Sequence, residues 1–89
     1  MTSVQDESFD PCVYLFTDEY CGVDIKLHVV QHRVALHNSG SFHWILSITS
    51  ERYQSKVRGR DQSEKYACIS AGFQALSWHL RSARREIFG

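Results

Sequence analysis

Histidine and cysteine are the side chains of this sequence that could hold a metal ion. Five histidines and three cysteines occur among the 89 residues, but no two cysteines form a C-x-x-C. The H-x-x-x-H of His28 and His32 falls in a stretch that alternates like a strand, not on a helix. Structural zinc needs a compact set of four ligands, which this spacing does not provide. We therefore expect no metal and no other cofactor, with histidines on a solvated sheet face and cysteines as small core residues.

Motifs for catalysis are also missing from the sequence. It contains no G-x-S-x-G, no Gly-rich phosphate loop, and no carboxylate pair with a dedicated base nearby. His79 is expected on a helix flank near Gly72 and Ala75, which suits packing at a boundary better than proton transfer. We name no catalytic residue and expect that the protein is not an enzyme.

The basic C-terminal half is the first binding signal. Residues 1–50 hold two basic and six acidic residues, a balance of minus four, whereas residues 51–89 hold eight basic and four acidic residues, a balance of plus four. Small proteins often segregate charge by chance, but such a split can also steer a charged partner. A nucleic-acid surface is one hypothesis, with Tyr53 and Trp78 as stacking platforms. The neutral net charge argues against it. The strand residues proposed for this surface are Arg52, Tyr53, Lys56, Arg58 and Arg60, joined by the helix residues Arg81, Arg84 and Arg85.

Trp78 is the second binding signal. At about 100° per residue it lies about 180° from the Phe73–Leu80 stripe of the C-terminal helix. Tryptophan and arginine are the types most enriched at binding hot spots, and small residues let another backbone approach. We therefore predict a protein partner here, although Trp78 could instead fold against its own helix or the N-terminal tail. The predicted partner-binding residues are Gln74, Trp78, Arg81 and Arg85, and the small neighbours are Ala67, Ala71, Ala75 and Ser82.

The element that must position Trp78 is a helix predicted from Asp61 to Phe88. Asp61 and Glu64 are spaced like a capping box at its start. Its apolar residues recur at steps of three and four, which predicts one buried stripe, with Phe73 against Trp44 or Leu46. About 27 residues at roughly 1.5 Å each reach about 40 Å, so we expect Ile87 and Phe88 to overhang a shorter sheet and favour a homodimer. The stripe comprises Tyr66, Ile69, Phe73, Leu76, Leu80, Ala83 and Ile87.

Alternating apolar residues predict the strands before this helix. The predicted order is a strand at Cys12–Thr17, a turn at Asp18–Gly22, a strand from Val23, a turn at Asn38–Ser41, a strand at Phe42–Ile48, and a basic edge strand at Tyr53–Val57 that Gly59 ends. The apolar parity slips after Val29, so either a turn at Gln31–His32 or a bulge intervenes, and we favour a short break. The fold class is α+β: an antiparallel β-meander of four to five short strands with one long C-terminal helix packed on one face.

Length and composition indicate one domain, with 1–11 as a flexible N-terminal tail and 12–89 as a single α+β domain. The chain has no apolar run of about 18 residues and no secretory signal, so we expect no membrane contact. An odd count of three cysteines favours a reducing cytoplasm. Cys12 and Cys21 flank the first turn, and a disulfide between them stays open for an oxidising environment.

The run Trp44-x-Leu46-x-Ile48, a turn, Tyr53-x-Ser55-x-Val57-x-Gly59 and an acid-led helix resembles small hairpin-plus-helix proteins of bacteria and their phages. The resemblance covers residues 42–83, and such proteins include anti-CRISPR-type inhibitors of host defence complexes. It implies a small non-enzymatic protein that binds and blocks a macromolecular partner, in the host cell cytoplasm if phage-encoded. An antitoxin-like or immunity-like protein fits equally, and a nucleic-acid-binding regulator is the alternative. The resemblance assigns no functional residue.

Overall fold

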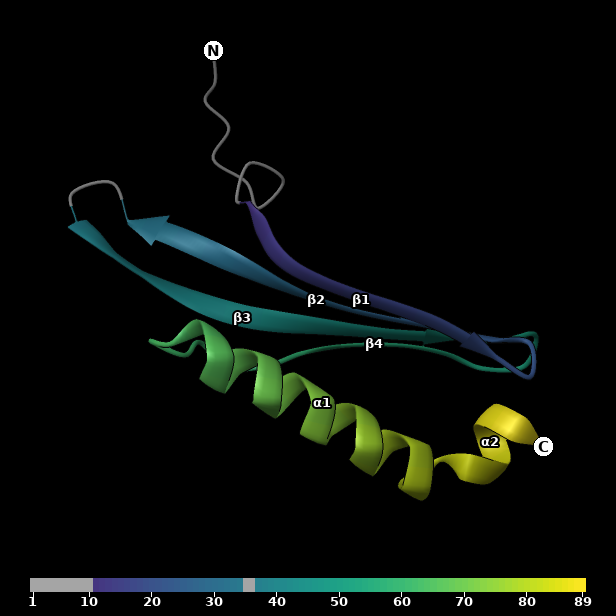
Figure 1. The fold of residues 1–89 in the computed structure, drawn as a ribbon. Coiled ribbons are helices and arrows are strands. Elements are labelled where there is room, and N and C mark those ends of the chain that lie inside the picture. Colours follow the sequence, from purple (N-terminus) through teal and green to yellow (C-terminus); the bar gives the residue numbers. More distant parts are fainter. Residues whose placement is uncertain (1–10, 35–36) are drawn as a thin grey trace, which may run out of the picture.

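A four-stranded antiparallel sheet and two C-terminal helices on one face of it make up the protein (Figure 1). The computed structural model describes the backbone of residues 11–34 and 37–89 and the side chains of residues 11–32 and 40–89. Strand order follows chain order, so the sheet is the predicted meander, and the α+β class is confirmed. The elements are β1 (Cys12–Tyr20), β2 (Val23–Val34), β3 (His37–Thr49), β4 (Gln54–Arg58), α1 (Lys65–Ser82) and α2 (Arg84–Phe88).

The hairpin between β1 and β2 turns on only two residues. Cys21 has a φ of 55° and Gly22 a φ of 77°. A two-residue turn with positive φ at both positions matches the right-handed twist of the flanking strands, so β1 continues to Tyr20 before the chain reverses. The predicted turn is present, but it is shorter than Asp18–Gly22.

The β2–β3 hairpin differs from the prediction. β2 runs unbroken from Val23 to Val34, and its register against β3 shifts between His32 and Val34. The bulge therefore accounts for the parity slip, and the favoured break is wrong. The predicted turn at Asn38–Ser41 is also wrong, because Ser41 pairs with His32 inside the sheet. Within the extended hairpin, backbone N–H and C=O groups of both strands bond to one another. A turn at Asn38–Ser41 would leave those groups to bind water.

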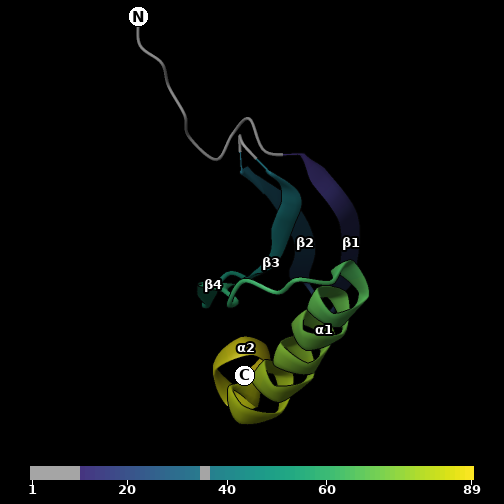
Figure 2. The ribbon, with the colours of Figure 1, turned by 90° about the vertical axis from the view of Figure 1, so that its left-hand side faces the viewer.

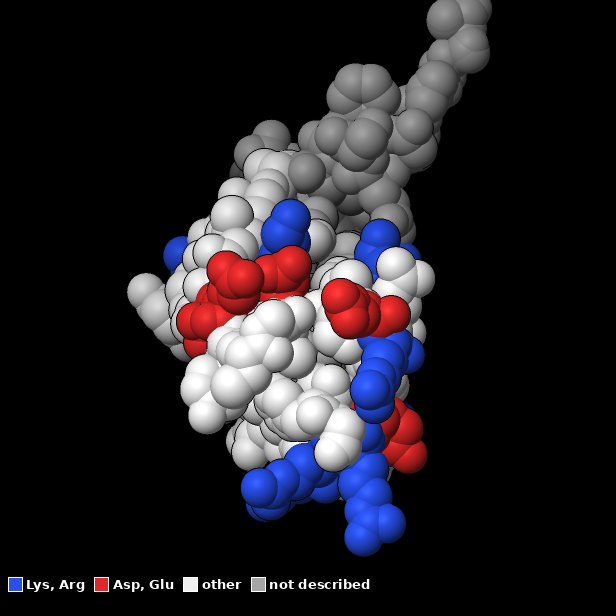
Figure 3. All heavy atoms as spheres, turned by 90° about the vertical axis from the view of Figure 1, so that its right-hand side faces the viewer, with Lys and Arg blue, Asp and Glu red and all other residues white. Residues whose placement is uncertain are grey.

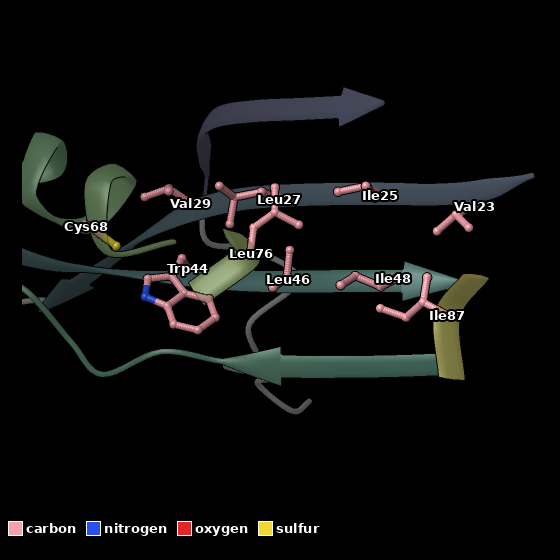
Figure 4. Close-up of a cluster of buried hydrophobic side chains, with 10 residues drawn as sticks. All are labelled: Val23, Ile25, Leu27, Val29, Trp44, Leu46, Ile48, Cys68, Leu76 and Ile87. Atoms are coloured by element: carbon pink, nitrogen blue, oxygen red, sulfur yellow. The ribbon is translucent and has the colours of Figure 1, made fainter. Parts of the chain in front are cut away.

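The core lies between the sheet and α1. Alternate residues of β2 and β3 point toward the helices and are buried, as the alternation predicts (Figure 4). On the helix, Gly72 is buried, and a Cβ added there would stand 2.8 Å from Cδ1 of Leu27. The absence of a side chain at Gly72 thus lets α1 approach β2 closely. The sheet residues of the buried core cluster are Val23, Ile25, Leu27, Val29, Trp44, Leu46 and Ile48.

The C-terminal helix starts later than predicted. Gln62 exchanges two backbone hydrogen bonds of 2.7 Å with Phe42, which holds the chain extended beyond Asp61. α1 begins at Lys65, and Glu64 at its N-cap position makes no side-chain capping bond. The predicted capping box of Asp61 and Glu64 is therefore not formed.

The helix also ends earlier, and its last turn folds back. Ala83, with φ −111° and ψ 27°, separates α1 from α2. The break lets α2 turn under the sheet, where Ile87 is 3% exposed and points toward Val23 and Ile48 (Figure 4). Phe88 meets the Tyr20 ring edge-on at 6.0 Å. The predicted overhang of Ile87 and Phe88 is wrong, and the argument for a dimer that rested on it falls.

The buried face of α1 is rotated from the predicted stripe. Its centre is the line of Cys68, Gly72 and Leu76, which are the buried residues of the helix. Phe73 is half-buried and packs its ring against Phe16 and Tyr14 of β1, at centroid distances of 5.0 and 6.2 Å, rather than against Trp44 or Leu46.

Candidate partner-binding surface on the C-terminal helices

Two large aromatic side chains stand exposed on the side of α1 that faces away from the sheet. Tyr66 is 75% exposed and Trp78 is 59% exposed. At about 100° per residue, Gln74 and Arg81 lie about 160° and 180° from Gly72, the middle of the buried Cys68–Gly72–Leu76 line, whereas Tyr66 and Trp78 lie about 120° from it on opposite flanks. We call the following exposed residues the outer helix surface: Tyr66, Gln74, Trp78 and Arg81 of α1, and Arg85 of α2.

Arg81 and Arg85 meet at the junction of the two helices. With Ser82, Arg84 and Glu86 they line a shallow hollow of about 340 Å³. Three arginines against one glutamate make this end of the helical layer positive. Figure 3 shows basic side chains gathered on this lower end, whereas acidic side chains gather mainly higher up, on the layer of the sheet. Their position near the C-terminus of α1 also suits the helix dipole.

Trp78 is anchored at its base. Its ring meets the His79 ring edge-on, with centroids 5.8 Å apart. His79 is half-buried, and its Nε2 lies 3.4 Å from Oγ of Ser55 on β4. The Ser55–His79 contact therefore ties α1 to the edge of the sheet, in agreement with the boundary role predicted for His79. It fixes the backbone that carries Trp78 while the indole stays accessible.

The structure brings together all four predicted partner-binding residues and adds one that the sequence reasoning placed elsewhere. Gln74, Trp78, Arg81 and Arg85 are exposed, as an interface requires. Tyr66 was assigned to the buried stripe but belongs to this surface. Its ring carries Nζ of Lys65 at 5.4 Å from the centroid, a cation–π contact. The spacing of four in Cys68-Gly72-Leu76 was the signal that could have placed Tyr66 outside.

The predicted alanine strip is only partly exposed. Ala67 and Ser82 are exposed, but Ala71 and Ala75 are half-buried and pack against the core. The small residues on that flank therefore serve the approach of α1 to the sheet. The part of the prediction that concerned a smooth face for a second backbone is wrong for these two positions.

The residues proposed for nucleic-acid binding lie on different sides of the molecule. Lys56 and Arg58 pair across β3 with Ser47 and Ile45, on the sheet face that points away from the helices. Tyr53 packs against the core on the opposite side, which removes it as a stacking platform. Arg52 lines a separate hollow of about 540 Å³ beside Phe88. The exposed Arg60 follows β4. Lys56 and Arg58 therefore do not share a face with the helix arginines, whereas Arg52 lies near the C-terminal end of α2, where a Cβ added at Gly89 would be 3.4 Å from its Nη1.

A small basic area does occur on the outer sheet face. Lys26 on β2 and Lys56 on β4 flank Ser47 of β3 in one cross-strand row. Burial lowers the pKa of the neighbouring His28 from its ordinary value, and the charges of Lys26, Lys56 and His43 lower it further. The acidic Asp24 lies two residues from Lys26 on one side, and Arg58 lies in the row of His28 and Ile45 on the other side, so the positive charge extends along the face in one direction only.

The described cysteine and histidine side chains form no common centre. Cys12 and Cys21 are free and stand at opposite ends of β1, about 30 Å apart at 3.3 Å per residue, so the disulfide left open above is excluded. Cys68 is buried, and burial and the nearby Asp61 raise its thiol pKa. Within the described residues, no group of three or more His, Cys, Asp or Glu side chains is placed to hold a metal ion. None of the described helices combines the length and hydropathy that crossing a membrane requires.

Comparison with models of protein families, with curated proteins and with solved structures finds no match to this chain. The surfaces of the protein therefore provide the evidence for its function.

Proposed function

We propose that this chain is a non-enzymatic protein that binds and blocks a protein partner through the outer helix surface. The observation that carries the proposal is the exposure of Trp78 on α1, with the exposed Arg81 three residues further along the helix and Arg85 lining the same hollow as Arg81. A helix in a small domain normally turns polar residues to water on this side. Aromatic residues and arginine are the types that dominate interface energetics, because they combine a large apolar area with directed polar contacts.

The chemistry of the surface describes the partner. Trp78 suits an apolar pocket, since its indole stays exposed while its base rests on His79. The arginines at the junction of α1 and α2 suit carboxylates around that pocket, because a guanidinium binds a carboxylate through two parallel hydrogen bonds. We therefore infer an apolar groove with an acidic rim as the complementary surface.

Blocking follows from the way the surface is held. α1 is fixed to the sheet by the close approach at Gly72 and by the Ser55–His79 contact. A preorganised helix loses little conformational entropy on binding, which favours tight occlusion of a partner's own site. An inhibitor of a host defence complex, an antitoxin-like protein or an immunity-like protein would each act in this manner, in the cytoplasm.

Affinity capture with matched variants tests the proposal. Tagged wild-type protein, Trp78→Ala and Tyr20→Ala are incubated with nuclease-treated lysate of the source organism, and retained proteins are quantified by mass spectrometry. Tyr20 is 62% exposed but lies on β1, outside the outer helix surface, so Tyr20→Ala is the control. We expect one protein to be retained by the wild type and by Tyr20→Ala, and to be depleted at least about tenfold with Trp78→Ala, since a hot-spot truncation costs about 2 kcal/mol or more.

Salt separates this reading from the nucleic-acid alternative. Contacts to phosphates lose about three to five orders of magnitude in affinity between 50 and 200 mM salt when 6–10 phosphates are bound. Binding through Trp78 should change little over that range. Retention that disappears at 200 mM salt, or retention of nucleic acid before nuclease treatment, would overturn the proposal in favour of the regulator.

A further inference from the structure

β1 is the least buried strand of the sheet although its sequence is strongly apolar. None of its nine residues is fully buried, and Leu15 is 57% exposed. Residues Cys12–Thr17 include no charged residue, proline or glycine, and they are mostly aromatic or apolar. Among the described residues β1 has a neighbouring strand, β2, on one side only. Its other edge therefore presents backbone N–H and C=O groups that are available for pairing.

The opposite edge of the same sheet is built differently. β4 has only five residues, and Lys56 and Arg58 alternate along it with exposed side chains. Short length and inward or flanking charge are the devices by which proteins prevent unwanted edge pairing. β1 has neither device between Tyr14 and Thr17, although a bulge between Cys12 and Tyr14 interrupts the regular strand at its start. The contrast between the two edges of one sheet favours a partner strand at the β1 edge.

We propose that β1 pairs with β1 of a second copy of this chain, antiparallel about a twofold axis at Leu15, so that two sheets become one of eight strands. A twofold axis requires each residue to pair with its counterpart across the axis. Centring on Leu15 places Tyr14 opposite Phe16 of the second copy, within the regular part of β1, and leaves the bulge between Cys12 and Tyr14 at each end of the paired segment.

Charge favours this register. Asp18 and Glu19 are the only ionised side chains of β1. A register centred on either of them would set two like charges directly opposite, which destabilises a strand pair. Centred on Leu15, the acidic residues of each copy lie beside the uncharged start of the other strand. The apolar run then matches the apolar run.

Both faces of the joined sheet gain apolar contact in this register. On the outer face the two exposed Leu15 side chains cover one another at the axis. On the helix face Tyr14 and Phe16 already pack against Phe73. Facing their counterparts, they would link the aromatic clusters of both copies into one. Cross-strand aromatic pairs stabilise a sheet in addition to its ladder hydrogen bonds.

The mass in solution is the first test. Sedimentation equilibrium from 1 to 200 μM should show a reversible species of twice 10.3 kDa for the wild type. Leu15→Lys places two like charges at the axis and should weaken association at least about tenfold. Thr49→Lys adds the same charge on an exposed site of β3, away from the β1 edge, and should leave association unchanged. Circular dichroism of both variants checks that each monomer folds.

A cross-link tests the register itself. In a Cys12→Ser, Cys21→Ser background, Leu15→Cys would bring two thiols together at the axis, because Cα atoms of opposed residues lie about 4.5–5.5 Å apart and disulfides span about 4.4–6.8 Å. Mild oxidation should yield a covalent dimer. Thr17→Cys is the matched control: its two thiols would be offset by about four residues, roughly 13 Å along the strands, and should not link.

The test of the dimer can be distinguished from the test of partner binding. Trp78→Ala should leave the dimer intact, since Trp78 is on α1 and outside β1. A wild type that stays at 10.3 kDa up to 200 μM would overturn the pairing of β1 with β1. The occupant of the β1 edge would then be residues 1–10 or a strand of another protein. The pairing would also be overturned by a dimer that Leu15→Lys does not weaken, or by one that Trp78→Ala dissociates.

Discussion

Phe73 and Trp78 are five residues apart on α1 and have different surroundings. Phe73 packs against Tyr14 and Phe16, whereas Trp78 is 59% exposed and touches His79. Because Phe73 is only half-buried, Phe73→Ala should cost about 2–3 kcal/mol, at or below the lower end of the range for buried aromatic residues. Trp78→Ala should stay within about 0.5 kcal/mol of wild type. Urea unfolding of both variants measures this, and equal losses would contradict the exposed position of Trp78.

Gly59 lies directly against Trp44 at the end of β4. Its backbone N–H donates to the carbonyl of Trp44 at 2.9 Å, and an added Cβ would collide with the buried indole. Trp44 is itself 8% exposed, so the ring has little room to move. Gly59→Ala should therefore destabilise the fold by about 1–3 kcal/mol, as overpacking does. Thermal unfolding beside Ser63→Ala, an exposed position of the same linker, provides the comparison.

His28 makes stability depend on pH. Its pKa is lowered in the fold, first by burial and then by Lys26, Lys56 and His43. The unfolded chain therefore binds more protons near and below pH 6.5, so this histidine reduces stability as the pH falls through that value and has no such effect well above it. Urea titrations at pH 5 and pH 8 should show a smaller loss on acidification for His28→Gln than for wild type. An equal loss in the two proteins would show that His28 has no part in it.

Tyr66 shows why single residues on a helix were the hardest to place from sequence. Steps of three and four joined it to Ile69 and Phe73, but at about 100° per residue Tyr66 lies about 120° from Gly72, the centre of the buried face. The structure centres burial on Cys68, Gly72 and Leu76, two of which are small. Small residues can lie at the centre of a buried helix face, where they let the helix approach the sheet. A prediction based on bulky apolar residues overlooks them. Trp78, with no apolar neighbour at helical spacing on its own side, was placed correctly.

At the scale of elements, α2 acts as a cover for the end of the sheet. Ile87 is 3% exposed within the core cluster, although it is the third residue from the C-terminus. Ile87→Ala should cost about 2–5 kcal/mol, as for other buried isoleucines. The neighbouring Glu86 is exposed, and Glu86→Ala should change little. Chemical denaturation of the pair tests the fold of α2, since an overhanging helix end would make the two substitutions alike.

The strands could be predicted because the alternation of apolar and polar residues is a local pattern. The turns were harder to predict. β2 and β3 show alternating apolar residues that any reading recovers, and Gly22 marks its turn by its freedom at positive φ. Asn38–Ser41 carries the same turn chemistry but pairs within the sheet, because the long β2 offers partners as far as Val34. Turn propensity is a local preference of about 1 kcal/mol or less, and a ladder of backbone hydrogen bonds outweighs it. The break at Ala83 had no local signal, since alanine is the best helix former.

At the scale of the molecule, the positive charge of the second half is concentrated in the helices. α1 and α2 together carry Lys65, Arg81, Arg84 and Arg85 against Glu86, whereas the strands carry acidic and basic side chains in nearly equal number (Figures 1 and 3). Figure 2 shows both helices on the same side of the curved sheet. Because consecutive strands pair, this arrangement could be read from the order of elements alone. Which arginines share a surface could not, because that depends on the rotation of α1 and the turn into α2.

We expect that no metal bound by the histidines and cysteines stabilises the fold. A structural metal couples its binding free energy to folding, so chelation unfolds such proteins. We expect the midpoint of thermal unfolding to be the same with and without millimolar EDTA. A fall of several degrees would show that a metal is bound by residues that we assign to packing and to the sheet surface.

The contrast between the two tryptophans gives the protein two built-in optical reporters. Trp44 is 8% exposed in the core and Trp78 is 59% exposed on α1. In a Trp78→Phe variant the remaining indole emission should shift to the red only when the core opens, and acrylamide should quench it weakly before then. In a Trp44→Phe variant the emission should begin red-shifted and move to the blue when a partner excludes water from the outer helix surface. Folding and binding can thus be followed in the same cuvette without an attached dye.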